Sequence, residues 1–416
     1  MPGSAAPDPY DGPVPDRPCK PGSKVLLAMS GGVDSSLAAS VLLEQGYDVV
    51  GVFMRLGSPG DTVGELIPEN GCDPSKIRIG KQGCCSVGDA GDARLVAAQL
   101  GIPFYVCNFR DDFGRIIDYF IDEYARGRTP NPCVRCNDWL KFGKLHDYAN
   151  QIGADLVASG HYARVDDTPA LRRGRDASKD QSYVLFGVPH DRLAHMLLPI
   201  GDMLKTETRD LARERGLPVF DKPDSQEICF VPDNDYSGLI ERRRPELASP
   251  GPILDREGQI IGEHGGAHRF TIGQRRGLGI ASERPLYVID KDAEANTVTV
   301  GEPDDLLSTG CLCAESNWLT DAHGFEDWAP CLAQIRYNSP AVPARARVIP
   351  DLDAPTPSGR TGAFEIRFDD PQRAVAPGQA AVLYSHTDPD LVLAGGWIVR
   401  SSPLRAPRPA DVPSHE

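Results

Sequence analysis

The sequence predicts an α/β protein in which a parallel-sheet domain precedes a small central domain and an all-β domain. Strand-like and helix-like segments alternate over residues 24–215, which is typical of a parallel sheet covered on both faces by helices. From about residue 217 Pro or Gly recurs every few residues, and from about 285 short strands follow at regular intervals, indicating a β-barrel or sandwich. The expected parts are a disordered leader (1–22), the parallel-sheet domain (23–216), the central domain (217–284), the all-β domain (285–402) and a disordered tail (403–416).

The parallel sheet is expected to bind a ligand at one edge. Its predicted strands are Lys24–Ser30, Asp48–Met54, Pro103–Asn108 and Asp155–Ser159. Ligands of such sheets sit beyond the carboxyl ends of the strands. We therefore expect the residues at those ends to converge on one crevice, namely Ser30, Met54, Asn108 and Gly160.

The all-β domain is predicted from seven short segments rich in apolar and β-branched residues. They lie at 286–290, 297–300, 332–337, 344–348, 363–368, 380–384 and 396–399. Cys311 and Cys313 alternate along a further strand, so both side chains face the same side and are expected to serve as core packing.

Composition narrows the class of protein. No apolar run approaches the roughly 20 residues that span a bilayer, and the proline-rich N-terminus is neither a signal peptide nor a transit peptide, so a cytoplasmic protein without membrane contact is expected. Eleven cysteines without a secretory signal argue against a disulfide framework. The net charge of −15 argues against a nucleic-acid partner, but basic clusters at Arg172–Lys179 and Arg269–Arg276 could offset it locally.

The segment Ser30-Gly31-Gly32-Val33-Asp34-Ser35-Ser36 predicts a phosphate site. It follows the apolar run Val25–Met29, and its glycines let the backbone approach a ligand closely. A helix expected from Asp34 to Gln45 would point its N-terminus at an anion there. The segment fits neither the P-loop nor the dinucleotide pattern. It resembles the pyrophosphate loop (PP-loop) of the ATP pyrophosphatase superfamily, whose members cleave ATP between its α and β phosphates.

A C-x-x-C pair, Cys133 and Cys136, lies in Arg128–Asn137 and is the second candidate site. The flanking Arg128 and Arg135 would favour the thiolate form. The alternative is half of a structural zinc site, which would need two further ligands, and no second C-x-x-C lies nearby.

Cys229, in Asp224–Val231, is the third candidate. Apolar flanking residues are typical of a small buried cysteine, whereas the Pro- and Asp-rich connector around it favours a functional surface loop.

Seven segments in order resemble the tRNA-specific 2-thiouridylase family over residues 24–400. They are SGGVDSS, TPNPCVRCN, ASGHYAR, SKDQSYVLF, DSQEICFV, HRFTIGQRRGLGI and RYNSP. The resemblance implies an adenine nucleotide alpha hydrolase-like catalytic domain, a small central domain and a C-terminal β-barrel that binds tRNA. It implies that ATP adenylates the C2 oxygen of the wobble uridine, and that sulfur from a cysteine persulfide, delivered by a donor protein, replaces this oxygen.

The resemblance also implies roles for individual residues. Cys136 would be the nucleophile and Cys229 the persulfide carrier. A disulfide would join the two at one stage of the reaction. ATP would be held by Ala28, Met29, Ser30, Gly31, Gly32, Val33, Asp34, Ser35, Met54 and Gly160. Asp34 is also the expected Mg²⁺ partner, because a hard cation prefers carboxylate oxygen. The tRNA contacts would be Asn131, Pro132 and Cys133 to the target base, Lys179, Asp180 and Gln181, and Arg336 and Tyr337 in the barrel.

The chain departs from the commoner family pattern in two places. Many members carry an acidic residue at the position of Cys133, so three thiols, Cys133, Cys136 and Cys229, could instead hold a [4Fe–4S] cluster. Both a persulfide relay and cluster-assisted transfer stay open at this point. The second departure is a long insert at 55–86, in which Cys72, Cys84 and Cys85 are either incidental or metal ligands.

Two rival functions remain. A small-molecule amidating or ligating enzyme of the same superfamily would need neither Cys136 and Cys229 nor a barrel. A metal- or RNA-binding protein that has kept the fold without activity would release no pyrophosphate.

Overall fold

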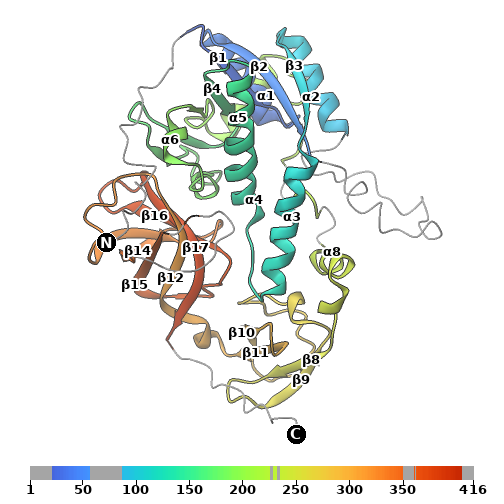
Figure 1. The fold of residues 1–416 in the computed structure, drawn as a ribbon, viewed down its shortest axis with the longest axis vertical. Coiled ribbons are helices and arrows are strands. Elements are labelled where there is room, and N and C mark those ends of the chain that lie inside the picture. Colours follow the sequence, from blue (N-terminus) through green and yellow to red (C-terminus); the bar gives the residue numbers. More distant parts are fainter. Residues whose placement is uncertain are drawn as a thin grey trace, which may run out of the picture.

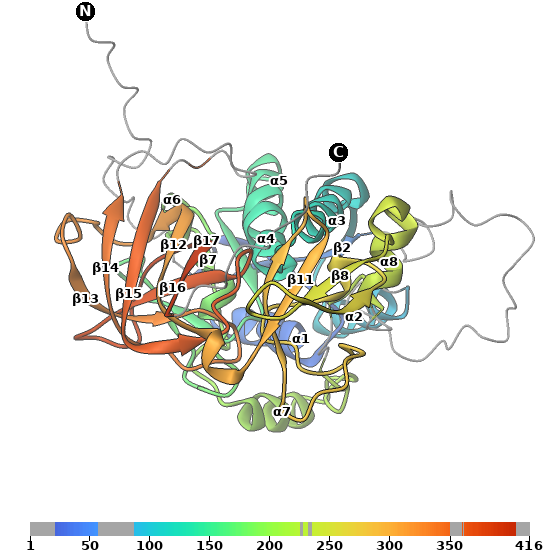
Figure 2. The ribbon, with the colours of Figure 1, turned by 90° about the horizontal axis from the view of Figure 1, so that it is seen from below.

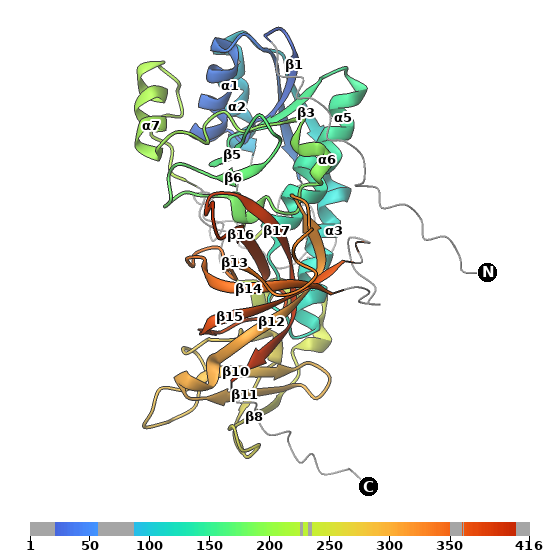
Figure 3. The same ribbon diagram turned by 90° about the vertical axis from the view of Figure 1, so that its left-hand side faces the viewer.

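The computed structural model describes residues 21–56, 87–224, 228–231, 235–349, 360 and 362–404. The three predicted parts are arranged along the long axis of the molecule, in an order that differs from their order in the sequence (Figure 1). The parallel-sheet domain lies at one end, the barrel in the middle and a small sheet at the other end (Figure 3). The expected disordered leader and tail lie almost wholly outside the described residues, as do Cys72, Cys84 and Cys85.

The first domain contains the predicted parallel sheet, in the order β3-β2-β1-β4-β7. The four predicted strands are confirmed as β1 (Lys24–Ala28), β2 (Asp48–Arg55), β3 (Phe104–Asn108) and β4 (Leu156–Ser159). The sequence did not reveal β7 (Met196–Leu197), because two residues carry no periodicity. All of these strands pair in parallel.

Helices cover both faces of this sheet, as the alternation predicts. Leu26 of β1 enters one core cluster, while Val25 and Leu27 enter another, because successive side chains of a strand point to opposite faces. One face carries α1 (Val33–Glu44), α2 (Val87–Leu100) and α7 (Lys205–Glu214). The other carries α3 (Arg110–Ala125) and α5 (Leu145–Gln151), and Figure 2 shows the two groups on opposite sides.

The C-x-x-C segment lies in a continuous helical stretch between α3 and α5. It begins as α4 (Pro132–Arg135), with Pro132 at the first position, where a missing N–H costs nothing. From Cys136 to Lys144 it continues as a π-helix, a conformation that is rare and frequent at functional sites. A hairpin of β5 (Ala163–Val165) and β6 (Leu171–Arg173), followed by α6 (His190–Leu193), completes the domain.

The central domain has a four-stranded sheet in the order β10-β11-β8-β9, next to α8 (Tyr236–Arg243). Its strands are β8 (Gly251–Leu254), β9 (Ile260–His264), β10 (Tyr287–Asp292) and β11 (Thr297–Gly301). We predicted 286–290 and 297–300 as strands of the C-terminal domain, and that grouping was wrong. Both segments are strands, but β11 pairs with β8, a partner about 45 residues earlier that local sequence does not reveal.

The C-terminal strands close into the barrel β12-β15-β14-β13-β16-β17. They are β12 (Leu307–Trp318), β13 (Ala329–Gln334), β14 (Val342–Ile349), β15 (Ala363–Arg373), β16 (Ala380–Ser385) and β17 (Val392–Pro403). Cys311 and Cys313 both lie in the barrel core, with their sulfur atoms 3.9 Å apart, as expected for core packing. Within the described part of the chain, no helix has the length and apolar character needed to cross a membrane.

Candidate nucleotide and thiol site

The loop after β1 has the close backbone packing predicted for a phosphate site. Gly31 has φ +73°, and a Cβ there would collide with the backbone carbonyl of Asp89. The Ser35 hydroxyl accepts a hydrogen bond from the backbone N–H of Ser30 at 3.1 Å. The Ser36 hydroxyl donates to the Gly32 carbonyl at 2.8 Å. The loop is therefore shaped by its own hydroxyls at the N-terminus of α1.

Gly160 packs directly on this loop from the end of β4. A Cβ at Gly160 would lie 2.7 Å from the carbonyl carbon of Asp34 and from the backbone nitrogen of Ser35. The predicted convergence of β1 and β4 ends is therefore observed. Met54, at the end of β2, is paired with Cys107 in β3 and packs against the core cluster that includes α3.

A charge network connects the loop to the segment that precedes Cys229. Lys205 Nζ donates to both carboxylate oxygens of Asp34, at 2.7 and 2.8 Å, and lies 2.9 Å from Asp224 Oδ1. Lys179 and Arg209 also contact Asp224, at 2.9 and 2.7 Å. Burial alone would raise the pKa of Asp224, but hydrogen bonds from Lys205 and Lys179 lower it to about 2.

Two further side chains connect this loop to its surroundings. The Tyr162 hydroxyl donates to Asp34 at 2.8 Å, and burial together with the Asp34 charge raises the pKa of Tyr162. Lys222 donates to the Gly31 carbonyl at 2.9 Å and pairs with Asp89 at 2.6 Å. Sequence reasoning missed Lys205, Tyr162 and Lys222. Lys205 and Lys222 lie in none of the recognised segments, and Tyr162, although it is part of ASGHYAR, was given no role. Each reaches the loop from more than 120 residues away, a contact with no local signal.

The two cysteines of the C-x-x-C pair differ in environment. Cys133 is exposed and Cys136 is partly buried. Cys133 lies near the barrel residue Tyr337, whose pKa is raised by burial and by the nearby Asp180 and Cys133. Cys136 packs against the core cluster that contains α3.

Arg135 does not act as the sequence predicted. We expected its guanidinium to favour thiolates at Cys133 and Cys136. Instead, its side chain is 1% exposed and its Nη2 donates to both carboxylate oxygens of Glu315, at 2.8 and 2.9 Å. The Glu315 carboxylate neutralises most of the field that Arg135 would exert on a thiol.

Cys229 is held by its neighbour Phe230. The Phe230 ring packs edge-on against Phe113 and Phe120 of α3, with ring centroids 5.7 and 5.2 Å apart. Cys229 and Cys136 both pack against the same core cluster. Both are thiols here and not a disulfide.

The [4Fe–4S] expectation for the three cysteines is not confirmed. Cys133, Cys136 and Cys229 are all described, yet the described residues hold no group of three His, Cys, Asp or Glu side chains that could bind a metal. Cys133 lies near Tyr337 in the barrel loop, and Cys229 is next to Phe230, which packs on α3. The cluster therefore stays a hypothesis.

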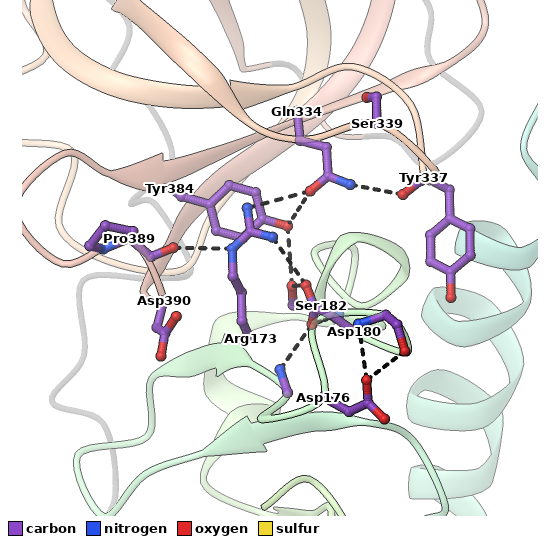
Figure 4. Close-up of polar contacts among 12 residues, drawn as sticks. Arg173, Asp176, Asp180, Ser182, Gln334, Tyr337, Ser339, Tyr384, Pro389 and Asp390 are labelled. Atoms are coloured by element: carbon purple, nitrogen blue, oxygen red, sulfur yellow. Dashed lines mark hydrogen bonds and ion pairs between the residues drawn. The ribbon is translucent and has the colours of Figure 1, made fainter. Parts of the chain in front are cut away.

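The expected tRNA-binding residues Asp180 and Tyr337 line one cavity of about 580 Å³ between the first domain and the barrel. Figure 4 shows this region. Asp180 accepts hydrogen bonds from the backbone N–H groups of Gly174 and Ser182, at 2.9 and 3.0 Å. Gln181 accepts from the backbone N–H of Tyr162 at 2.8 Å. Asp180 therefore holds the backbone on either side of it, and Gln181 holds the backbone of Tyr162, whose hydroxyl contacts Asp34.

The basic segment Arg172–Lys179 is largely neutralised within the protein. Arg172 pairs with Asp166 and Asp388, and Arg173 pairs with Asp180 at 3.2 Å. The Arg173 guanidinium also lies 3.6 Å from the centre of the Tyr384 ring, across the domain boundary (Figure 4). This segment therefore forms polar contacts between the two domains. It is not the exposed positive patch that would have offset the negative net charge.

Comparison with known protein families shows the class of protein to which this chain belongs. Three family profiles match in succession: a tRNA methyl transferase HUP domain (23–233), a tRNA methyl transferase PRC-barrel domain (238–302) and an aminomethyltransferase β-barrel domain (308–398). Fold and site together define an enzyme whose HUP domain carries a PP-loop for ATP, followed by two β domains.

The relatives identify the family. The tRNA-specific 2-thiouridylase MnmA of Rhodopirellula baltica is 46% identical and covers 91% of this chain and 97% of its own. That of Symbiobacterium thermophilum is also 46% identical, covering 91% of this chain and 92% of its own. The chain belongs to the tRNA-specific 2-thiouridylase MnmA family. Among solved structures, a 4-thiouridine synthetase bound to RNA and ATP covers 54% of this chain at 17% identity and TM-score 0.33, a weak likeness.

Proposed function

We propose that this protein is a tRNA-uridine 2-sulfurtransferase that uses ATP to replace the C2 oxygen of the wobble uridine with sulfur. One observation supports this most strongly. Asp224, five residues before Cys229, is joined through Lys205 to Asp34 in the ATP loop, so activation and sulfur chemistry share one connected site. Neither rival function, a small-molecule ligase or a binding protein, would need this link or the two cysteines.

ATP provides the activation step. The uridine C2 oxygen attacks the α-phosphate, forming a C–O–P linkage to AMP, and pyrophosphate leaves. The loop at Ser30–Ser35 and the α1 N-terminus would hold the pyrophosphate, with Ala28, Met29, Met54 and Gly160 around the nucleotide. AMP is then a good leaving group on a carbon that was a poor electrophile.

Asp34 fits a Mg²⁺ ion that accompanies ATP. Magnesium in nucleotide sites takes one or two carboxylates and completes its shell with phosphate and water, so one carboxylate beside the loop is sufficient. When bound, the ion would shield the phosphate charge. Because Lys205 already neutralises Asp34, the ion and the lysine would compete for this carboxylate.

Sulfur transfer uses the two thiols Cys136 and Cys229. A donor protein would load a persulfide on Cys229. Its terminal sulfur attacks C2 and displaces AMP, and the Cys136 thiolate then attacks Cys229 Sγ. The S–S bond to the nucleoside breaks, 2-thiouridine forms with the electron pair, and a Cys136–Cys229 disulfide remains for an external dithiol to reduce.

The tRNA substrate would be bound across the joint between the first domain and the barrel. The target base must leave its stack to reach Cys136, and Asn131, Pro132 and Cys133, at the start of α4, would contact it. The tRNA would also be contacted by Lys179, Asp180 and Gln181 on one side and by Arg336 and Tyr337 on the other. A cytoplasmic location accords with this substrate.

The family profiles carry the word methyl transferase, whereas the relatives are named thiouridylases. The residues favour thiolation. Methyl transfer would not use ATP cleavage at a PP-loop, and this chain carries that loop.

The test is an assay with ATP, a persulfide donor and unmodified tRNA, in which 2-thiouridine in the digest and released pyrophosphate are both measured. Cys136→Ser and Cys229→Ser should each reduce 2-thiouridine at least 10³-fold while pyrophosphate is still released on the first turnover. Cys311→Ala, in the barrel core, is the matched cysteine control and should remain active. Absence of 2-thiouridine from the wild-type protein with a competent donor would refute the proposal.

A further inference from the structure

We propose that Arg135 is a positioning residue for sulfur transfer: its ion pair with Glu315 of the barrel fixes the helix turn that carries Cys136. The inference rests on the role of Cys136 proposed above. Arg135 directly precedes Cys136, and its partner lies 180 residues further along the chain, in β12. The pair therefore joins the catalytic turn to the domain that binds tRNA.

The guanidinium is enclosed by aromatic rings from three elements. Its Cζ lies 4.2 Å from the ring centre of Trp397 in β17, 4.9 Å from that of Tyr119 in α3 and 5.1 Å from that of Trp139 in the π-helix. A planar cation among aromatic faces is held by cation–π attraction as well as by its carboxylate. The position of the Arg135 side chain is thus fixed by both domains.

The barrel is locally distorted where it supplies Glu315. Glu315 has φ +51°, a left-handed conformation that is unfavourable for a non-glycine residue. The register between β12 and β17 also shifts between Ala314 and Asn317, as at a β-bulge. Bulges redirect a side chain next to functional sites. Here the irregular backbone accompanies the carboxylate that Arg135 binds.

Two further contacts hold the helix turn that carries Cys136. Asn137 donates to the Val184 carbonyl at 2.9 Å, and Arg360 lies 3.4 Å from the Asp138 carboxylate. The buried residues Arg135, Asn137 and Asp138 are therefore anchored, while Cys133 and Cys136 keep access to solvent.

Stability alone does not account for this pair. A buried ion pair pays a desolvation cost that can exceed its Coulomb attraction, and apolar residues of similar volume often serve stability as well or better. We expect the ion pair to set the orientation of the turn that carries Cys136 relative to the bound tRNA. Adenylation, at the ATP loop, should not depend on it.

The test compares Arg135→Met, Glu315→Leu and the double variant, with Arg213→Met as the matched control on an exposed helix surface. Each protein is assayed for first-turnover pyrophosphate release, single-turnover 2-thiouridine formation, tRNA Kd and Tm. Arg135→Met should lower sulfur transfer 10- to 100-fold, with pyrophosphate release and tRNA Kd within twofold of wild type. Both single variants should lower Tm, since each removes one partner of a buried ion pair.

The double variant separates positioning from folding. It removes both charges, so its Tm should recover toward wild type while sulfur transfer stays low. Recovery of sulfur transfer together with Tm would overturn the proposal and make the pair structural. Parallel loss of pyrophosphate release in a folded Arg135→Met would also overturn it. Failure of the proposed function is distinguishable, because the wild-type protein would then form no 2-thiouridine in the same assay. Failure of the role proposed for Cys136 is distinguishable too, because Cys136→Ser would then still form 2-thiouridine.

Discussion

The Lys205 ammonium group lies 2.7 and 2.8 Å from the two carboxylate oxygens of Asp34, and its side chain is only 10% exposed. Asp34 belongs to the first turn of α1 in the ATP loop, whereas Lys205 begins α7. Because Lys205 also contacts Asp224, one lysine bridges two carboxylates from different parts of the chain. The charge balance at the ATP loop therefore depends on a residue outside the loop motif.

Replacing Lys205 should damage both ATP chemistry and stability. Lys205→Met leaves Asp34 and Asp224 without their shared cation, and we expect a loss of about 1–3 kcal/mol in the free energy of unfolding, since both carboxylates keep some solvent. First-turnover pyrophosphate release should fall at least tenfold. Lys144→Met, which removes an exposed lysine, is the control. Unchanged pyrophosphate release in folded Lys205→Met would show that the pair plays no part in activation.

Substituting Gly160 should weaken ATP binding through steric pressure. In Gly160→Ala the new Cβ meets the backbone of Asp34 and Ser35 at 2.7 Å, and overpacking of this kind costs about 1–3 kcal/mol. We expect the KM for ATP to rise at least tenfold. Gly114→Ala is the matched control, because no heavy atom outside its own helix lies within 4 Å of the added Cβ. A wild-type KM for ATP in Gly160→Ala would show that the loop at Asp34 and Ser35 moves to accommodate the added Cβ without effect on ATP binding.

The Asp224 carboxylate predicts a dependence of stability on pH. Its pKa in the folded protein, about 2, lies below the ordinary value of 3.8, so it stabilises the fold above pH 3.8 and loses that effect as the pH falls toward 2. The contribution is at most about 2 kcal/mol and is reduced by solvent screening. In urea unfolding from pH 7 down to the lowest pH at which both fold, the difference between wild type and Asp224→Asn should be constant above pH 5 and shrink below pH 4. A difference that does not change with pH would contradict this.

Phe230 should matter for sulfur transfer more than for activation. Phe230→Ala removes the edge-on contacts with Phe113 and Phe120 that hold the Cys229 segment on α3, each worth about 0.5–1.5 kcal/mol. Single-turnover 2-thiouridine formation should fall about tenfold, while pyrophosphate release stays within twofold. Phe230→Leu, which keeps apolar volume, should show a smaller loss. Equal loss of both activities would assign Phe230 to general folding.

Local patterns in the sequence determined much of this molecule. The Gly-Gly turn after an apolar run predicted the ATP loop, and alternation of strands and helices predicted four strands of the parallel sheet, since both signals lie within a few residues. The ordered motifs around Cys136 and Cys229 indicated the family. The period-two placement of Cys311 and Cys313 correctly predicted core packing.

Tertiary structure decided what depends on distant pairs. Three contacts join residues that are far apart in sequence. The strands β10 and β11 join the sheet of β8 and not the barrel, Lys205 contacts Asp34, and Glu315 neutralises Arg135. The sequence shows which residues are charged, but it does not show which residues pair with them, because the packing of the elements sets the pairing. The sequence thus determined the chemistry available, and the fold decided which charges act on it.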